Sequence, residues 1–158
     1  MIMSLENITE RTFVIIKPDG VHRQNVGEII SRFENKGLKI VGLKMLRISE
    51  AQAREQYACH KGKAFYDSLV EFITSGPSVA VVLEGRNAIS ITRKLMGATD
   101  PLAAEPGTIR GDLSLDIKHN LVHGSDSQDS FNHEMPIYFK PNELLNYDIP
   151  IKDWLYYL

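Results

Sequence analysis

The chain has 158 residues, of which 43% are hydrophobic, and its 18 basic and 20 acidic side chains give a formal net charge of −2. This length suits a single domain, 1–158, and so small a net charge provides no field that would recruit a nucleic-acid backbone. The longest uncharged run, Phe72–Leu83, falls short of the ~20 apolar residues of a membrane span, and the sequence shows no signal peptide. We therefore expect a cytoplasmic protein that binds neither a membrane nor a specific nucleic acid.

Apolar residues run continuously in some segments and recur at helical spacing in others. The resulting elements, in chain order, are a strand over 12–16, a helix between 25 and 37, a strand over 38–48, a short helix over 49–57, a helix over 65–74, a strand over 79–83, a helix ending at 97, a helix over 127–134 and a strand over 137–139. Strands that alternate with helices indicate an α/β layer structure, although the order of the strands in the sheet stays open.

Three local signals place individual residues within these elements. The turn signal Lys17–Gly20 closes the first strand, so Lys17 lies at the C-terminal end of that strand. Gly42 interrupts the second strand, which predicts a β-bulge. Ser49 and Gln52 form the pattern of a capping box at the start of the short helix that follows.

The segment from Gly97 to Leu115 is the longest stretch without a hydrophobic period, and it contains Pro101, Pro106 and Gly107. Structureless loops of more than ~12–15 residues are uncommon inside compact domains and are usually functional or disordered. We therefore expect this segment to be a functional loop.

The segment NLVHGSDS, residues 120–127, places His123 directly before Gly124. A histidine is largely neutral near pH 7 and is able to form covalent phosphoramidate intermediates. Ser125 and Glu134 would orient the ring, because a carboxylate bound to one ring nitrogen fixes the tautomer and leaves the other nitrogen free. A histidine in a polar surface turn is the alternative, and the residues alone leave both interpretations open.

Cationic and hydroxyl side chains at element ends or in the irregular loop form a second group of candidates, namely Lys17, Arg93, Thr99 and Arg110. If they converge they form a phosphate site, and if they do not they are solvated surface groups. Metal ligands are not expected from the protein itself, because Ile137 occupies the second histidine position of an H-E-x-x-H motif and no other cluster has metal-ligand spacing.

Five segments in continuous order resemble the nucleoside diphosphate kinase family. They are FVIIKPDGV (13–21), YACHKGKAFY (57–66), SGPSVAVVLEG (75–85), GATDPLAAEPGTIRGD (97–112) and NLVHGSDS (120–127). The resemblance runs from about Thr12 to Phe139, and the N-x-x-H-G-S-D block is highly specific to that family. It implies a family core over about 12–139 within the single domain, followed by a C-terminal tail over 140–158.

The resemblance implies a ferredoxin-like βαββαβ fold, an α+β sandwich with a four-stranded antiparallel sheet, helices on one face and a long nucleotide-binding loop. It also implies an enzyme that transfers the γ-phosphoryl group of ATP or another nucleoside triphosphate to a nucleoside diphosphate, by a ping-pong mechanism through a phosphohistidine on His123. Mg2+ is the implied cofactor, carried mainly by the nucleotide phosphates. The implied assembly is a homohexamer or, in some members, a tetramer.

The same resemblance implies roles for individual residues. His123 matches the phosphorylated histidine, Glu134 the carboxylate that orients it, Ser125 the hydroxyl beside it, and Tyr57 the tyrosine near it. The residues that match nucleotide-binding positions are Lys17 and Asn120 for the sugar and phosphates, Arg93, Thr99, Arg110 and His60 for the phosphates, and Phe65 and Ile117 for the two faces of the base. Stacking on an aromatic ring tolerates every base, so a broad base range is expected.

Two residues depart from the family pattern, and two other functions compete with the kinase. Ala64 replaces the proline that usually precedes Phe65, and Asp100 stands where asparagine is common, which places a negative charge close to a polyanionic ligand. A histidine phosphatase or mutase would carry an arginine directly before its histidine, where this chain has Val122. A non-catalytic ferredoxin-like module would lack the nucleophile or the phosphate-binding cations.

Overall fold

The computed structural model describes residues 9–156. The strands are β1 (Glu10–Ile16), β2 (Lys39–Arg47), β3 (Pro77–Gly85) and β4 (Val122–Gly124). The helices are α1 (Pro18–His22), α2 (Val26–Asn35), α3 (Glu50–Gln56), α4 (Tyr66–Thr74), α5 (Ala88–Met96), α6 (Ile109–Leu113), α7 (Gln128–Tyr138) and α8 (Lys152–Leu155), with short 3-10 turns η2 (Ala58–His60), η3 (Pro101–Ala103) and η4 (Pro141–Glu143). Within the described residues, no helix has both the length and the apolar character needed to cross a membrane.

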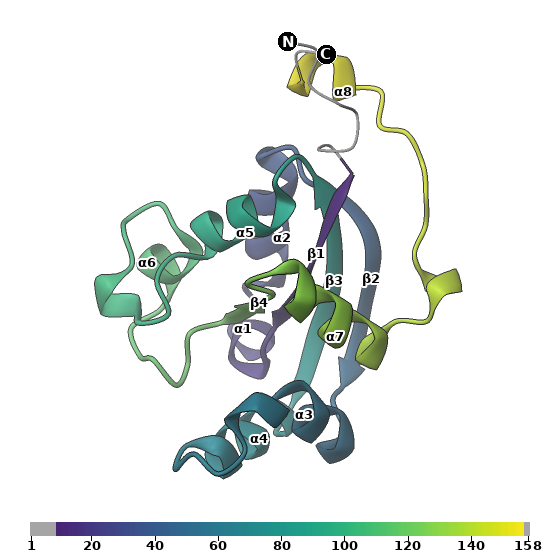
Figure 1. Cartoon of the computed structure of the whole chain (residues 1–158). Coiled ribbons are helices and arrows are strands. Elements are labelled where there is room, and N and C mark those ends of the chain that lie inside the picture. Colours follow the sequence, from purple (N-terminus) through teal and green to yellow (C-terminus); the bar gives the residue numbers. More distant parts are fainter. Residues whose placement is uncertain (1–8, 157–158) are drawn as a thin grey trace.

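The strands form one antiparallel sheet in the order β2-β3-β1-β4 (Figure 1). β1 is a central strand, which pairs with β3 from Glu10 to Ile16 and with β4 from Val14 to Ile16. α2 connects β1 to β2, and α5 lies between β3 and β4, which gives the βαββαβ order of a ferredoxin-like fold. The fold predicted from the sequence is confirmed.

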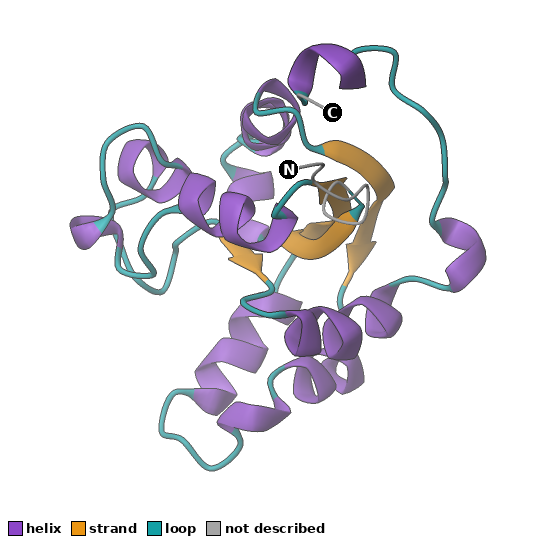
Figure 2. Cartoon of the chain, turned by 45° about the horizontal axis from the view of Figure 1, so that its top comes forward, coloured by secondary structure: helices purple, strands orange, loops and turns teal. Residues whose placement is uncertain are grey.

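Both faces of this sheet are buried at its central strand β1. Successive strand residues point to opposite faces, and Phe13, Val14, Ile15 and Ile16 of β1 are all inaccessible to solvent. Phe13 and Ile15 belong to a core that includes residues of α3, α4 and α7, whereas Val14 and Ile16 belong to a second core with residues of α2, α5 and α6. Figure 2 shows helices on either side of the strands. The expectation of helices on one face therefore holds for the crossover helices α2 and α5, while α3, α4 and α7 form an additional layer.

The fourth strand lies earlier in the chain than the hydrophobic pattern indicated. The prediction of a strand over 137–139 is wrong, because Ile137 and Tyr138 continue α7 and the fourth strand is Val122–Gly124. Glu134 and Tyr138 are one helical turn apart and are both buried, whereas three residues are too few for β4 to show an alternating pattern. The histidine of the NLVHGSDS segment therefore lies on a strand of the sheet and not in a surface turn.

The three local signals are confirmed. Lys17 directly follows β1, and the register of β2 shifts between Ile40 and Gly42. At the start of α3, Ser49 Oγ accepts the backbone N–H of Gln52 at 3.2 Å, and the backbone N–H of Ser49 donates to Gln52 Oε1 at 3.0 Å. The strand end, the bulge and the helix start thus follow from local sequence chemistry.

The segment 97–115 is more regular than expected, because it contains η3 and α6. Thr108 caps α6, since its Oγ1 accepts the backbone N–H of Gly111 at 3.0 Å. The guanidinium of Arg32, on α2, donates to Asp112 Oδ2 at 2.7 Å. A hydrogen bond within the loop and an ion pair to the crossover helix α2 therefore fix the position of α6.

The C-terminal tail runs along the outer side of β2 (Figure 1). The backbone N–H of Leu145 donates to the carbonyl of Val41 at 2.8 Å, and the Tyr147 hydroxyl donates to the carbonyl of Ile40 at 2.5 Å. The ammonium of Lys39 donates to the Tyr147 carbonyl at 2.7 Å. These contacts cover part of an edge strand whose backbone groups would otherwise be unpaired.

We expect Gly111→Ala to destabilise the fold, because an added methyl group would lie 2.0 Å from the backbone carbonyl oxygen of Glu105. Overpacking of this kind costs roughly 1–3 kcal/mol, and each kcal/mol lowers the melting temperature by about 2–4 °C in a chain of this size. Circular dichroism during heating measures the change. Gly27→Ala in α2 is the matched control, because nothing lies within 4 Å of its added methyl group. Equal melting temperatures for the two variants would contradict the close packing of α6.

Candidate active site

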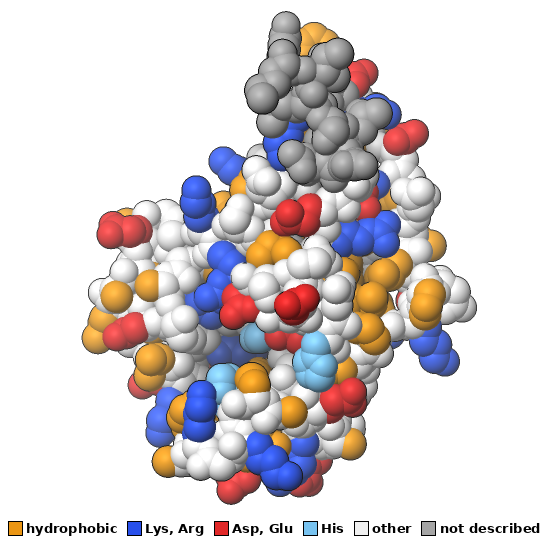
Figure 3. Space-filling view, in the orientation of Figure 1, with side chains coloured by type: hydrophobic (Ala, Val, Ile, Leu, Met, Phe, Trp, Pro, Cys, Tyr) orange, Lys and Arg blue, Asp and Glu red, His pale blue; other side chains and the backbone are white. Residues whose placement is uncertain are grey.

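A cavity of about 590 Å³ opens beside β4, and Lys, Arg and His side chains gather around a hollow on this face of the molecule (Figure 3). Most of the predicted site residues line this cavity, namely Lys17, Tyr57, Phe65, Arg93, Thr99, Arg110, Ile117, Asn120 and His123. The other three, His60, Ser125 and Glu134, contact those residues or one another. The fold thus brings all the predicted site residues together.

The chain enters β4 through a strained turn at Leu121. Leu121 has a φ of 70°, which is unusual for a residue other than glycine. The backbone N–H of Val122 donates to the carbonyl of Asn120 at 2.8 Å, so the three residues form the rare γ-turn with a positive central φ. Strain of this kind costs of order 1–3 kcal/mol and persists only where the surroundings enforce it. Here the enforcing surroundings include the second core, in which Leu121 is buried.

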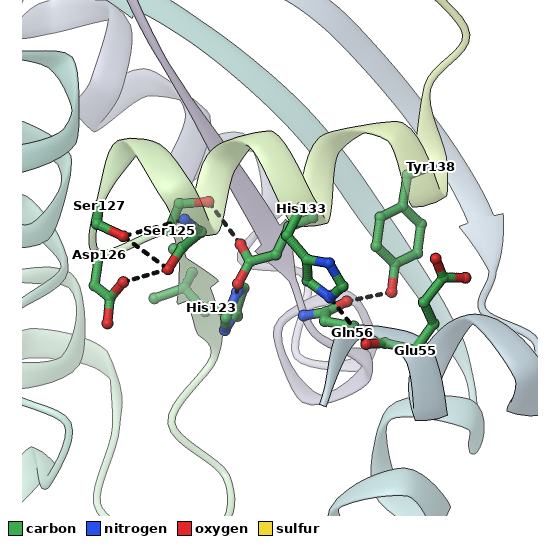
Figure 4. A network of polar contacts seen from close by, with 12 residues as sticks. Glu55, Gln56, His123, Ser125, Asp126, Ser127, His133 and Tyr138 are labelled. Atoms are coloured by element: carbon green, nitrogen blue, oxygen red, sulfur yellow. Dashed lines mark hydrogen bonds and ion pairs between the residues drawn. The ribbon is translucent and has the colours of Figure 1, made fainter. Parts of the chain in front are cut away.

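His123 faces a buried carboxylate. Its Nε2 is enclosed by protein and lies 3.0 Å from Glu134 Oε1, a close contact without full hydrogen-bond alignment. The Ser125 hydroxyl donates to the other oxygen, Oε2, at 2.6 Å. Figure 4 shows His123 and Ser125 beside the first turns of α7, the helix that carries Glu134. Burial opposes ionisation of Glu134, but the pairing with His123 and the bond from Ser125 outweigh it and hold the pKa of this carboxyl below its usual value.

Four rings form a row from β4 to the start of α4. The Tyr57 ring stands edge-on to His123, with centroids 6.0 Å apart and planes at 88°. His60 lies beyond, 6.3 Å from Tyr57 and 5.4 Å from Phe65 between ring centroids. Burial and the charge of Glu134 raise the pKa of Tyr57, so its hydroxyl stays protonated. Burial, Lys63 and His123 lower the pKa of His60, which favours a neutral imidazole.

Lys17 is a buried cation at the end of β1, with 6% of its surface exposed. Its ammonium donates to the side-chain oxygen of Asn120, whose Nδ2 donates in turn to the carbonyl of Thr99 at 2.9 Å. Burial lowers the pKa of Lys17 to about 8; the charge of Asp19 opposes this and that of Arg110 adds to it. The free protein therefore holds this positive charge at an energetic cost that a bound anion would reduce.

Two arginines bind the outward carbonyls of the segment 120–124. Arg110 donates from Nε to the carbonyl of Asn120 at 3.1 Å and from Nη2 to that of Val122 at 2.7 Å, and it also reaches Gly97 through Nη1. Arg93 Nη1 donates to the carbonyl of Gly124 at 3.3 Å. Burial and the nearby charge of Arg93 lower the pKa of Arg110 to about 10, against the charge of Asp19. Each guanidinium keeps further N–H groups for a ligand, because an arginine has five.

The open side of the cavity is apolar. Phe65 and Ile117 line it with 50% and 55% of their surfaces exposed, respectively. Phe72 and His119 also line the cavity, although they were not predicted as site residues from the sequence. The Phe72 ring lies 5.4 Å from the ammonium of Lys17, and His119 stands edge-on to Phe72 at 5.0 Å. Phe72 is seven positions after Phe65 and thus on the same helical face, which is the signal that could have revealed it.

Three comparisons with known proteins agree with this geometry. The family model for nucleoside diphosphate kinase matches residues 10–144. Curated nucleoside diphosphate kinases from Carboxydothermus hydrogenoformans and Archaeoglobus fulgidus are each 53% identical over 93% of this chain, and the matches cover 99% and 97% of those proteins. A halophilic nucleoside diphosphate kinase from Halobacterium salinarum, solved in complex with CDP, superposes with a TM-score of 0.92 at 51% identity, over 94% of this chain and 99% of that one.

The chain belongs to the nucleoside diphosphate kinase family. Members with this name are phosphotransferases that use nucleotides and generally need a divalent metal ion. Within residues 9–156, no group of three or more His, Cys, Asp or Glu side chains is placed to hold a metal ion.

The two departures from the pattern of the nucleoside diphosphate kinase family have local structural contexts. Asp100 Oδ1 accepts the backbone N–H of Leu102 at 3.0 Å and so caps η3. Ala64 precedes Phe65, whose carbonyl accepts the backbone N–H of Leu69 at 3.0 Å as α4 begins. The charge of Asp100 thus helps to shape the loop, and α4 starts without a preceding proline.

We expect Glu134→Gln to lower the free energy of unfolding of this nucleoside diphosphate kinase family member by roughly 1–3 kcal/mol at pH 7, because it removes a buried, paired charge. The pKa of Glu134 lies below its ordinary value of 4.5, so this contribution is fully present above pH 4.5 and disappears as the pH falls through the folded-state pKa. Urea unfolding at pH 7, 5, 4 and 3 measures the difference. Exposed Glu71→Gln is the control, and a difference for Glu134→Gln that does not change with pH would rule out this origin.

Proposed function

We propose that this chain transfers the γ-phosphoryl group of ATP, or of another nucleoside triphosphate, to a nucleoside diphosphate in two steps through His123. One observation carries the proposal. The Nε2 of His123 is enclosed next to the Glu134 carboxylate, so Nδ1 is the nitrogen left to react beside a cavity lined by cations. Such an enzyme would supply the cell with nucleoside triphosphates other than ATP.

In the first step, the lone pair of Nδ1 attacks the γ-phosphorus, a P–N bond forms, and the bond from phosphorus to the bridging oxygen breaks so that ADP leaves. In the second step, a terminal phosphate oxygen of the acceptor diphosphate attacks, the P–N bond breaks, and the free imidazole returns. Phosphoryl transfer depends mainly on positioning and charge stabilisation. Arg93, Arg110 and Lys17 would supply positive charge, and loss of one such donor typically costs about 10²–10³ in rate.

Glu134 would orient His123 from its Nε2 side, and Ser125 would in turn orient Glu134. The carboxylate favours the tautomer with its proton on Nε2, which leaves Nδ1 unprotonated for attack. It would also stabilise the positive charge that the ring gains as the P–N bond forms. The Ser125 hydroxyl occupies the second carboxylate oxygen, at 2.6 Å, and so fixes the direction of the first. Tyr57 would hold the ring from the side through its edge-on contact.

The nucleotide would lie with its base toward the open, apolar side of the cavity and its phosphates toward His123. Phe65 and Ile117 offer faces for the base, and stacking is worth about 1–3 kcal/mol for any base. The CDP bound to the Halobacterium salinarum relative supports a diphosphate as ligand. Lys17 and Asn120 would contact the sugar and phosphates, and the phosphate-binding set would be Arg93, Thr99, Arg110 and His60.

We propose Mg2+ as the cofactor, carried into the site mainly by the nucleotide phosphates. The charged groups that line the cavity are predominantly cationic, including Lys17, Arg93 and Arg110, which repel a metal ion and attract a polyanion. Mg2+ keeps several waters and commonly binds through substrate phosphates. When bound, it neutralises phosphate charge, while the protein's own cations hold and orient the chain of phosphates.

We also propose that the protein acts in the cytoplasm as a homo-oligomer, a hexamer in preference to a tetramer. Exposed apolar side chains on β2, Leu43 at 51% and Met45 at 64%, support burial of this edge against another subunit. Sedimentation equilibrium measures the assembly, and a monomeric mass at micromolar concentration would reject the proposal.

The kinase mechanism predicts a phosphoenzyme. We expect wild-type protein mixed with γ-labelled ATP and Mg2+ to retain label that is acid-labile and base-stable, whereas His123→Gln retains none. Exposed His22→Gln is the matched control and should label like wild type. Added GDP should release the label as GTP, and water should release it slowly.

Two results would contradict the proposal. Rapid loss of label to water would favour a histidine phosphatase or mutase. A protein that binds ADP but never becomes labelled would instead be a non-catalytic ferredoxin-like module.

A further inference from the structure

Asp19 binds the backbone turn at Leu121, which lies 102 positions later in the chain. It lies in α1, in the KPDG segment after β1, and only 8% of its surface is exposed. Its Oδ2 accepts the backbone N–H of Leu121 at 3.0 Å. The carbonyl of Leu121 accepts the backbone N–H of Lys17 at 2.8 Å. Both polar backbone groups of Leu121 are therefore bound by the corner between β1 and α1.

The turn held in this way directs the active-site strand. Leu121 is the central residue of the γ-turn, with a φ of 70°. Asn120, on one side of the turn, reaches Lys17 through its side chain, and His123 lies on the other side in β4, two positions after Leu121. A turn with this strain needs outside support to persist. The Asp19 carboxylate is the side-chain part of that support.

One oxygen of the Asp19 carboxylate binds the turn, and the other does not. Asp19 Oδ1 is buried and has no hydrogen-bond partner within the part of the chain that the structure describes. A buried oxygen without a hydrogen bond lowers the stability of the fold, so its retention in a native protein needs a reason other than stability. The negative charge acts on both Lys17 and Arg110, the two most buried cations of the cavity, and opposes the lowering of their pKa values. Among residues 9–156, Asp19 is the anion that acts most strongly on each of these two cations.

We propose that Asp19 is a positioning residue for phosphoryl transfer, which fixes the turn that aims Asn120 and His123 and balances the charges of Lys17 and Arg110. This inference rests on the proposed function of the cavity, and it adds a residue that does not line that cavity. Asp19 acts through the turn and through its charge, without contact to the nucleotide.

Two substitutions separate the two roles. Asp19→Asn keeps an oxygen that accepts the Leu121 N–H but removes the charge. Asp19→Ala removes both and leaves a buried backbone N–H without a partner. We expect Asp19→Ala to slow phosphoenzyme formation from saturating ATP by about 10–100-fold, because a displacement near 1 Å in an active site can cost 10² in rate. Asp19→Asn should stay within about 5-fold of wild type at pH 6.5, where Lys17 remains charged.

The charge role is visible in the pH dependence of ADP binding. Loss of the Asp19 charge removes the main influence that raises the pKa of Lys17, so Lys17 becomes neutral at a lower pH. ADP affinity, measured by calorimetry, should fall in wild type as the pH rises through about 8, and in Asp19→Asn this fall should occur at a lower pH. The charged or titratable groups that act on Lys17 are Asp19 from α1 and Arg110 from α6, and those that line the same cavity are Arg93 from α5, Lys118 and His119 before β4, His123 in β4 and Tyr57 after α3.

Replacement of Lys17 by a cation that does not titrate in this range tests whether Lys17 causes the shift in the pH dependence of ADP affinity. In a Lys17→Arg background, Asp19→Asn should produce no acid shift, because the guanidinium keeps its charge over this range. Exposed Asp153→Asn serves as the charge-matched control and should leave the profile unchanged.

Two results would overturn the inference. One is an Asp19→Asn profile that coincides with wild type, and the other is a wild-type labelling rate for Asp19→Ala. If Asp19→Ala does not fold, Asp19→Asn alone decides. Failure of the proposed function is a separate outcome, since wild type would then not be labelled while its ADP affinity still reports on Asp19.

Discussion

The active site depends on how a strand of three residues is held at its outer edge. β1 pairs with β4 on one side, and on the other side the carbonyls of the segment 120–124 face a pair of guanidinium groups. Arg110 and Arg93 thus complete the sheet where a further strand would otherwise be needed. The cations proposed to bind the phosphates therefore also hydrogen-bond the segment that carries His123.

This arrangement places positive charge where the free protein would not favour it. Burial lowers the pKa of Lys17 to about 8 and that of Arg110 to about 10. Preorganised charge of this kind acts on a reacting group without the reorganisation that water would need. The strained φ of Leu121 is a second cost carried by the same few residues. The large apolar cores on both faces of the sheet offset these costs, which concentrate at the place where phosphate chemistry is proposed.

The sequence predicted the elements that depend on residues close together in the chain. Continuous apolar runs identified β1 and β3, and the capping box at Ser49 identified the start of α3. It failed at β4, because three residues have no period and the pairing with β1 is a long-range contact. The convergence of Lys17 and Asn120, 103 positions apart, is likewise invisible in a single sequence. The candidate residues came from family resemblance and motif chemistry. Their distances, burial and mutual orientation required the folded chain.

The central position of β1 has a consequence for how the site fails. Its residues Phe13 to Ile16 contribute to both cores. The same strand pairs with β4 on the side opposite β3. Opening of either helical layer alone leaves the opposite layer packed on β1, so we expect the backbone amides of this strand to exchange slowly with solvent. The strand that carries His123 thus pairs with a segment that belongs to both cores, and this pairing does not depend on one helical layer alone.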